Sequence, residues 1–327
     1  MFEKEVHFAG LLIDIAEEHC QSLRYRGTVV DFELGRFFSA MAYGIQEAWI
    51  AIAGLLPEIR NQSIDPKSFK DGSDFFTKAD LASEKVIRET FEPFGAAVRI
   101  FGEEEGRYLG NSAARISVRI DPIDGTRTMK FSRFKWSIMA GVYSRLAVEA
   151  EETQIMSMCY FPELTGQPVL FHVRGDDDWG GTYVVKTDFW EKLQVQQFPE
   201  RNDLGNIITT FWKHTDFRQR GAVQEIENEI ACAGGHAVST DAGSCDVLEA
   251  ALTAGQRAMI IDGDYNLVDF IPHPAITTLG YKIYRWDGTL MRPEDPALVN
   301  QKLVVVPPGK AGEQILKIVG RYATSGS

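Results

Sequence analysis

The sequence predicts an α+β arrangement in its first half and an alternating α/β arrangement in its second half. Helix-type hydrophobic periodicity dominates up to residue 91, and short strand-like runs follow it. After residue 205, strand-like and helix-like segments alternate along the chain. We therefore expect two subdomains, residues 34–204 and 205–327, and an extra N-terminal helical element over residues 1–33.

Three helices are predicted before the first strand. In each of them, apolar side chains recur every three or four positions and form one hydrophobic face. Pro57 is expected to end the second helix and Pro93 the third, because a proline inside a helix removes a backbone hydrogen bond. The predicted helices span residues 3–24, 33–56 and 78–91.

Strand-like runs follow the third helix. Residues 115–120 alternate between apolar and polar side chains and lead directly into Asp121. The strands predicted in the first subdomain cover residues 98–101, 115–120, 136–143, 155–161 and 168–173. In the second subdomain we expect strands at 207–211, 258–261 and 303–306, and helices at 222–231, 247–253 and 272–279.

Composition and charge narrow the function classes. Of the 327 residues, 44% are hydrophobic and 24% charged, as is usual for a soluble globular protein. The formal net charge of −12 argues against binding to nucleic acid or to anionic membranes, since both need a basic surface. The four cysteines are scattered and form no C-x-x-C pair, and the first residues do not resemble a signal peptide. We therefore expect a soluble cytoplasmic protein.

The segment Asp121-Pro-Ile-Asp124-Gly125-Thr126 is the first candidate for a functional site. Two carboxylates stand at the end of a predicted strand, where their oxygens can converge on a cation, and hard oxygen ligands at this density fit Mg²⁺. If a helix starts after Gly125, the free N–H groups of Gly125 and Thr126 would hold an anion. In the alternative interpretation, the two acids only satisfy backbone donors in a capped turn.

Three further acidic segments have ordinary explanations when each is taken alone. Glu103 and Glu104 follow a predicted strand and could lie in a solvated loop. Asp80 lies at the start of a predicted helix and could cap it, as could Asp269 for the helix that follows.

Together these segments resemble the inositol monophosphatase superfamily, which includes fructose-1,6-bisphosphatases, 3′-phosphoadenosine 5′-phosphate phosphatases and a class of histidinol phosphatases. The family pattern is T-x-x-D-x-x-x-E, G-E-E, D-P-I-D-G-T, G-[ST]-A and W-D-x-A, in that order. The matching segments here are Thr77/Asp80/Glu84, Gly102–Glu104, Asp121–Thr126, Gly243–Cys245 and Val268–Asp269. The resemblance implies a layered αβαβα sandwich of the inositol monophosphatase and sugar phosphatase type and sensitivity to lithium. It also implies a homodimer or tetramer, of which we expect the homodimer.

The resemblance also implies a ligand set for two or three Mg²⁺ ions. Glu103, Asp121 and the backbone carbonyl of Ile123 would hold one ion. Asp121, Asp124 and Asp269 would hold a second, and Glu104 would assist a more loosely bound ion.

The catalytic group implied by the resemblance comprises Asp80, Thr126 and Glu103. Thr126, hydrogen-bonded to Asp80, would orient or deprotonate the attacking water. The N–H groups of Gly125 and Thr126 would hold phosphate oxygens.

Substrate contacts are implied for Ser244, Cys245 and Asp262, although Asp262 could also belong to a surface turn with Asp264. The expected reaction is hydrolysis of a small phosphate monoester, such as an inositol monophosphate-like compound, histidinol phosphate or a sugar phosphate. The chain departs from the family pattern at Cys245, at Val268 and over residues 270–273. A second hypothesis is therefore a catalytically impaired relative that binds metal or ligand and has a regulatory or structural role.

Overall fold

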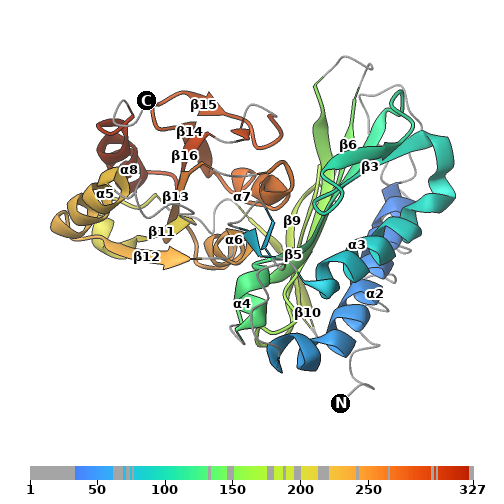
Figure 1. Cartoon of the computed structure of the whole chain (residues 1–327). Helices are drawn as coiled ribbons and strands as arrows, with labels where there is room; N and C mark the ends of the chain where they lie inside the picture. The colour runs from blue at the N-terminus through green and yellow to red at the C-terminus, as the bar shows by residue number, and fades with distance from the viewer. Residues whose placement is uncertain are drawn as a thin grey trace. The chain divides into compact units, whose positions relative to one another are not determined.

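A computed structural model describes the chain as two units, Met1–Lys192 and Leu193–Ser327 (Figure 1). The helical element predicted over residues 1–33 lies outside the described residues. Among the residues that are described, no helix is long and apolar enough to cross a membrane. The described residues are 34–61, 69–70, 74–75, 77–131, 134–145, 151–174, 180–186, 189–194, 200–212, 221–240, 243–263, 266–295, 298–299 and 301–323.

The first unit is built on an eight-stranded sheet of order β10-β9-β8-β7-β6-β5-β3-β4. All of the pairings whose register is described are antiparallel except β3 with β5, which is parallel. A two-stranded hairpin, β1 (Phe69–Lys70) and β2 (Asp74–Phe75), is separate from this sheet. The strands of the sheet are β3 Val98–Gly102, β4 Arg107–Gly110, β5 Ile116–Asp124, β6 Ser137–Ser144, β7 Thr153–Tyr160, β8 Val169–Val173, β9 Gly181–Lys186 and β10 Phe189–Leu193.

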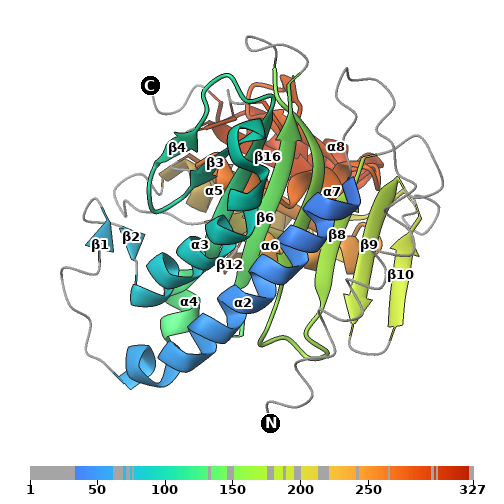
Figure 2. The ribbon, with the colours of Figure 1, turned by 90° about the vertical axis from the view of Figure 1, so that its right-hand side faces the viewer.

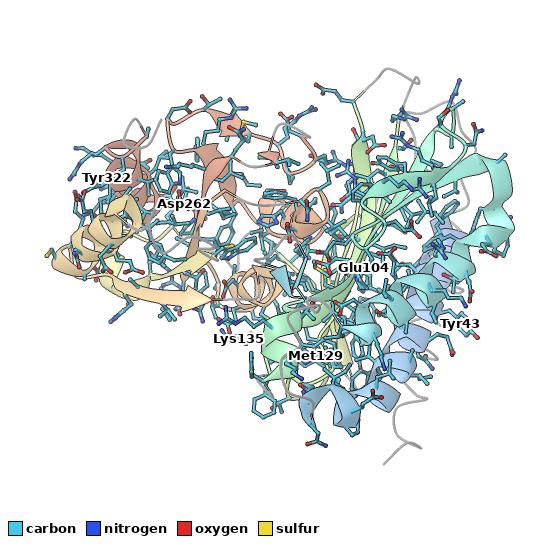
Figure 3. All side chains as sticks on the ribbon, viewed as in Figure 1. Tyr43, Glu104, Met129, Lys135, Asp262 and Tyr322 are labelled. Atoms are coloured by element: carbon cyan, nitrogen blue, oxygen red, sulfur yellow. The ribbon has the colours of Figure 1, made fainter. Side chains whose placement is uncertain are left out.

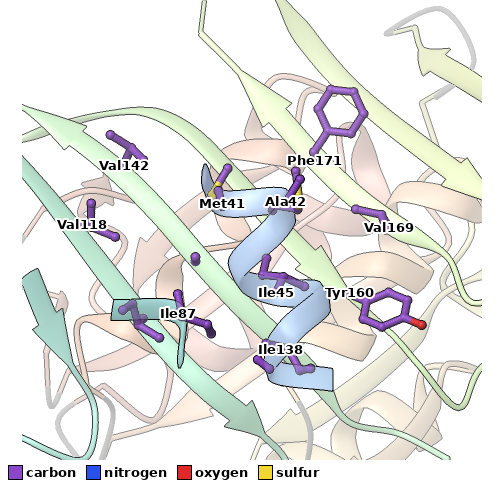
Figure 4. Close-up of a cluster of buried hydrophobic side chains, with 14 of the residues drawn as sticks. Met41, Ala42, Ile45, Ile87, Val118, Ile138, Val142, Tyr160, Val169 and Phe171 are labelled. Carbon is purple, nitrogen blue, oxygen red and sulfur yellow. The ribbon is translucent and has the colours of Figure 1, made fainter. Parts of the chain in front are cut away.

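Two helices, α2 (Leu34–Asn61) and α3 (Lys78–Phe91), lie side by side on one face of this sheet (Figure 2). Figure 4 shows Met41 and Ile45 of α2 facing the strands across a buried hydrophobic cluster. Burying one such side chain contributes about 1.5–3 kcal/mol, so this cluster fixes α2 on the sheet. Members of the cluster on the strands include Val118, Ile138, Val142, Val169 and Phe171.

The predicted end of the helix at Pro57 is wrong, because α2 continues to Asn61 with Pro57 inside it. Two tertiary contacts lie beyond the proline. Ile59 is 5% exposed, and Arg60 forms an ion pair with Glu163. These contacts stabilise the helix beyond the proline and offset the loss of the backbone hydrogen bond that the proline removes.

The second unit contains a six-stranded mixed sheet of order β12-β11-β13-β16-β14-β15. Helices α5 and α8 contribute to a buried cluster with β11, β13 and β16. The strands are β11 Ile208–Trp212, β12 His236–Thr240, β13 Arg257–Asp262, β14 Lys282–Arg285, β15 Leu290–Met291 and β16 Lys302–Val306. The α-helices are α5 Gly221–Cys232, α6 Gly243–Leu252, α7 His273–Thr277 and α8 Lys310–Gly320, and a short 3₁₀ turn, η8, covers Val268–Phe270.

The order of these strands creates a topological switch point. From β11 the chain passes through α5 to β12 on one side, and then through α6 to β13 on the other side of β11. Both neighbours are parallel to β11. In open α/β sheets, ligands bind outside the carboxyl ends of strands at such a point. Trp212 ends β11 and Asp262 ends β13, so both lie at this edge.

Candidate active site

A β-bulge brings Asp121 and Asp124 together at the end of β5. In the pairing with β6, Asp121 lies opposite Met139 and Asp124 opposite Ser137. Between these two pairs, β5 therefore contains one residue more than β6. Residues three apart on a regular strand point to opposite faces, and one extra residue reverses that relation. One carboxylate oxygen of Asp121 consequently lies within 4.8 Å of one of Asp124.

Gly125 turns the chain from β5 into the short helix α4, Thr126–Lys130. Its φ of 85° lies in the left-handed region, which an L side chain rarely adopts. No side chain caps this helix. Asp124 therefore does not serve as the helix cap, although Asp121 Oδ1 does accept a hydrogen bond from the N–H of Ile123 at 3.1 Å. The capped-turn interpretation thus accounts for the hydrogen bond from Ile123 but does not explain why the two carboxylates converge.

The two carboxylate oxygens of Asp80 accept hydrogen bonds from different segments of the chain. Oδ2 accepts from the N–H and the hydroxyl of Thr77, at 2.6 and 2.8 Å, and this closes a capping box at the start of α3. Oδ1 accepts from Thr126 Oγ1 at 2.8 Å. The same hydroxyl lies 2.9 Å from the carbonyl oxygen of Ile123, and its single proton can be donated to only one of the two. Asp80 therefore caps α3 and also contacts the D-G-T turn.

Burial raises the pKa of Asp80 to about 7, against the opposing effect of its hydrogen bonds from Thr77 and Thr126. The negative charge of Glu103 contributes in the same direction as burial. A carboxyl with a pKa near 7 can both release and accept a proton at neutral pH, which is what a general base requires.

Glu103 and Glu104 lie in the turn between β3 and β4 (Glu104 is labelled in Figure 3). The N–H of Glu103 donates to the carbonyl of Ile120 at 3.1 Å, which places this turn beside Asp121. Beneath the turn, the buried Glu84 accepts from the N–H of Glu104 at 2.7 Å. Burial raises the pKa of Glu84, and the charge of Glu103 adds to this effect.

Gly102 leaves the space that Glu84 occupies. A Cβ atom at Gly102 would lie 2.2 Å from the carboxyl carbon of Glu84, far below any real contact. The G-E-E segment and Glu84 of α3 therefore fit together as one unit.

In the second unit, Asp269 lies in η8 and Asp269 Oδ2 accepts from the N–H of Asn266 at 2.6 Å. It does not cap α7, whose N-cap residue is Pro272 and has no side-chain cap. Val268, which stands where the family has tryptophan, is fully buried.

His273 belongs to the same departure from the family pattern. Burial lowers its pKa to about 3, so the ring is neutral. It packs against Trp212 and Phe270 with ring centroids 5.4 and 5.0 Å apart. Among the residues that the structure describes, neither of its ring nitrogens has a hydrogen-bond partner. The altered segment is thus well packed around an imidazole that behaves as an apolar group.

Ser244 and Cys245 are both buried in the first turn of α6. Trp212 holds this turn, because Trp212 Nε1 donates to Asp246 Oδ2 at 2.9 Å and the indole lies directly against Gly243. A Cβ atom at Gly243 would approach that ring to 2.5 Å. The glycine of the G-[ST]-A segment is therefore required by the tryptophan at the end of β11.

Asp262 forms an ion pair with Lys302 of β16, with 3.5 Å between Lys302 Nζ and Asp262 Oδ1 (Asp262 is labelled in Figure 3). The two residues are direct partners in the antiparallel pairing of β13 and β16. Asp262 is thus part of a strand end and not only of a surface turn, whereas Asp264 lies outside the described residues.

The first unit therefore brings together Asp80, Glu103, Asp121, Ile123, Asp124, Gly125 and Thr126. The second unit carries Ser244, Cys245, Asp262 and Asp269. Neither Glu84 nor Lys302 was assigned a role from the sequence. Glu84 stands in the T-x-x-D-x-x-x-E segment, one turn after Asp80 on the same helix, and this spacing could have indicated it. For Lys302 the sequence contains no comparable signal.

Comparison with known proteins identifies the family of the chain and its fold. The family model described as the inositol monophosphatase family matches residues 38–323. Among solved structures, extragenic suppressor protein SuhB from Bartonella henselae aligns with a TM-score of 0.69 at 12% identity, covering 86% of this chain and 98% of that one. Inositol monophosphatase from Anabaena (Nostoc) aligns with a TM-score of 0.63 at 15% identity, with coverages of 89% and 97%.

Inositol monophosphatase II from Staphylococcus aureus also aligns, with a TM-score of 0.63 at 17% identity and coverages of 89% and 95%. No match to the chain was found among curated protein sequences. The likeness to solved structures confirms the predicted fold class, α+β and α/β of the inositol monophosphatase type.

Proposed function

Because the chain belongs to the inositol monophosphatase family, which supports phosphatase activity, we propose that it is a Mg²⁺-dependent hydrolase of a small phosphate monoester. Candidate substrates are inositol monophosphate-like compounds, histidinol phosphate and sugar phosphates. One observation carries the proposal. The bulge in β5 pairs Asp121 with Asp124, and α4 follows directly and places the Thr126 hydroxyl on Asp80.

The donors present fit Mg²⁺. Asp121 and Asp124 offer carboxylate oxygens, which this hard cation prefers. The negative charges of Asp121 and Asp124 also act on the buried thiol of Cys159. Its thiol pKa is raised by burial and further by the charges of Asp124 and Asp121. A divalent cation would neutralise these charges and permit an anionic substrate to approach.

The proposed metal ligands are those that the family resemblance implies. Glu103, Asp121 and the carbonyl of Ile123 would hold one ion. Asp121, Asp124 and Asp269 would hold another, and Glu104 would assist a third. Bound Mg²⁺ would polarise the phosphoryl group and offset the charge that develops on the leaving oxygen.

The proton path uses residues of the chain itself. The Thr126 hydroxyl donates to Asp80 Oδ1, so its oxygen lone pair remains available to accept a hydrogen bond from water. As that water attacks phosphorus, Thr126 Oγ1 receives the proton of the water and passes its own proton to Asp80. The raised pKa of Asp80 lets the carboxylate accept a proton near neutral pH.

The remaining contacts would hold the ester. The N–H groups of Gly125 and Thr126 stand at the start of α4 and would donate to phosphate oxygens. Ser244, Cys245 and Asp262 would contact the alcohol part of the substrate.

Phosphate release from a substrate panel tests the proposal. The panel comprises inositol 1-phosphate, histidinol phosphate, fructose 1,6-bisphosphate and adenosine 3′,5′-bisphosphate, each with added Mg²⁺ and with metal removed by chelation. We expect release from at least one compound only in the presence of Mg²⁺. Absence of release from every compound would favour instead a relative that binds metal or ligand without turnover.

We further propose that the protein is cytoplasmic, as its composition and cysteine pattern indicate, and that it is a homodimer that lithium inhibits, as the family resemblance implies. Light scattering on the purified chain would decide between monomer and dimer. A lithium titration of phosphate release that stays flat would remove the expectation of lithium inhibition.

A further inference from the structure

Lys302 forms an ion pair at the carboxyl end of β13, the strand end where Asp262, one of the proposed substrate contacts, lies. Asp262 and Lys302 are direct cross-strand partners, so their side chains project from the same face. Lys302 Nζ lies 3.5 Å from Asp262 Oδ1. The acid that would contact the alcohol part of the substrate is therefore joined to a cation.

Lys302 is held in place from a second side. Lys302 Nζ lies 4.9 Å from the ring centroid of Trp286, a cation–π distance. The indole is 2% exposed, and its Nε1 donates to the carbonyl of Leu303 at 3.0 Å. A lysine on an ordinary surface samples many rotamers, whereas this ammonium group is fixed between a carboxylate and an aromatic ring.

The cation is the more accessible member of the pair. The Lys302 side chain is 33% exposed and that of Asp262 only 6%. A ligand that approaches this strand end therefore meets an ammonium group with N–H donors to spare before it meets the carboxylate. A purely structural ion pair would have the same geometry, but it would not affect substrate choice.

We propose that Lys302 is a specificity-determining residue which selects substrates whose alcohol part carries a second anionic group, a phosphate or a carboxylate. This proposal rests on the proposed phosphatase function. An uncharged polyol gains nothing from the ammonium group, while a second anion forms a charge-assisted hydrogen bond with it. In this proposal the role of Asp262 is to orient Lys302, whereas the family resemblance implied that Asp262 would accept a hydrogen bond from a substrate hydroxyl.

Matched substrate pairs test the proposal through a ratio of kcat/KM values. The pairs are fructose 1-phosphate with fructose 1,6-bisphosphate, adenosine 3′-monophosphate with adenosine 3′,5′-bisphosphate, and glycerol 3-phosphate with 3-phosphoglycerate. In at least one pair we expect the wild-type enzyme to favour the doubly anionic member about tenfold, the scale of one modest interaction. Lys302→Gln should lower that ratio at least fivefold, and Lys302→Arg should keep most of it.

Lys282→Gln is the control. It removes a positive charge from β14 at the other end of the same sheet, where Lys282 pairs with Val306, and should leave the ratio unchanged. Asp262→Asn provides a second test should Lys302→Gln fold poorly. The amide keeps an oxygen that can accept from Lys302 but loses the negative charge, so the ratio should rise, and an unchanged or lower ratio would contradict the proposal.

A wild-type ratio near one in every pair, or a ratio that survives Lys302→Gln, would overturn the inference while leaving the phosphatase proposal intact. Absence of phosphate release from all compounds would instead reject the proposed function. Calorimetric binding of the same pairs in the presence of Mg²⁺ then decides about Lys302. Loss of the preference for the doubly anionic member in Lys302→Gln supports its role, and equal binding of both members rejects it.

Discussion

Asp80 Oδ1 accepts a hydrogen bond from Thr126 Oγ1 at 2.8 Å, and this bond joins the start of α3 to the first residue of α4. The other oxygen of Asp80 is engaged with Thr77 in the capping box. The sequence left a choice between a helix cap and a functional acid at this position. In the structure one oxygen closes the helix cap, and the other accepts from Thr126, the residue proposed to activate water.

Asp80→Asn should lower kcat by about 100-fold or more with little change in KM, because general-base assistance contributes roughly 10²–10⁴-fold. The amide can still accept a hydrogen bond from Thr126, but it cannot take a proton. Steady-state kinetics on the best substrate of the panel measures this.

Thr77→Ala is the matched control for Asp80→Asn. It removes the side-chain half of the capping box, including the 3.1 Å bond from the N–H of Ala79, and leaves the contact to Thr126. We expect a loss of about 1 kcal/mol in the free energy of unfolding and kcat within a few fold of wild type. Equal kinetic losses in both variants would show that the role of Asp80 is only structural.

Arg60 connects the end of α2 to the helix that carries Thr126. Its Nε donates to the carbonyl of Met129 at 3.1 Å, and its NH2 group reaches both oxygens of Glu163. Arg60→Gln should lower the free energy of unfolding by about 1–3 kcal/mol and kcat by about tenfold, because α4 loses the contact that orients it. Denaturant unfolding and kinetics on the same preparation measure the two effects.

Lys85→Gln is the control for Arg60→Gln, since its ion pair with Glu89 is largely exposed. Its effect on stability should stay within about 0.5 kcal/mol, and its kcat should not change. If Arg60→Gln also had wild-type kcat, Arg60 would not orient α4.

Gly102→Ala should displace Glu84 and with it the turn that holds Glu103 and Glu104. We expect a loss of about 1–3 kcal/mol from overpacking, and weaker Mg²⁺ binding by titration calorimetry. Gly54→Ala in α2, where an added Cβ has no neighbour within 4 Å, should instead stabilise by about 0.5–1 kcal/mol. A neutral Gly102→Ala would mean that the turn accommodates the methyl group without cost.

The lowered pKa of Glu152 should make the free energy of unfolding depend on pH. Burial by itself would raise the pKa of this carboxyl. The charge of Arg119, together with hydrogen bonds from Arg99 and Ser117, lowers it from 4.5 to about 2. Because the pKa is lower in the folded state, the stabilisation is complete above pH 4.5 and disappears as the pH falls towards 2.

The comparison of wild type with Glu152→Gln isolates this contribution. The difference in unfolding free energy should be on the order of 3 kcal/mol at pH 7 and should shrink as the pH falls to 2, at about 1.4 kcal/mol per pKa unit. Glu89→Gln, which removes an exposed carboxylate, should follow the wild-type curve. A pH-independent difference would show that the ion pair with Arg119 does not set the pKa.

Several strands of the core, β5 among them, could be predicted because their own residues determine them, whereas β9 and β14 were not predicted. The alternation over 115–120 identifies β5, and the motif after it identifies the acids. Short elements such as β4 and β15 contain too few residues to form a pattern. Helix α8 begins at Lys310, its N-cap residue Gly309 offers no side-chain cap, and no helix was predicted there.

Features of the site that depend on two distant segments were not accessible from the sequence. The bulge at Asp121 exists only relative to the register of β6. The partnership of Asp262 with Lys302 requires β16 to pair with β13. Residue types predicted the chemistry of the acidic site, while pairing between strands determined which acids converge and which are neutralised.

Phosphate release as a function of Mg²⁺ concentration, by the wild-type chain and by Asp121→Asn, tests the central claim most directly. Asp121 is 2% exposed and contributes to both proposed principal metal sites. We predict that wild-type release rises from near zero and saturates as Mg²⁺ is added. We also predict that Asp121→Asn, although folded, stays at least 100-fold slower at every concentration. Metal-independent release, or wild-type rates in Asp121→Asn, would contradict the account.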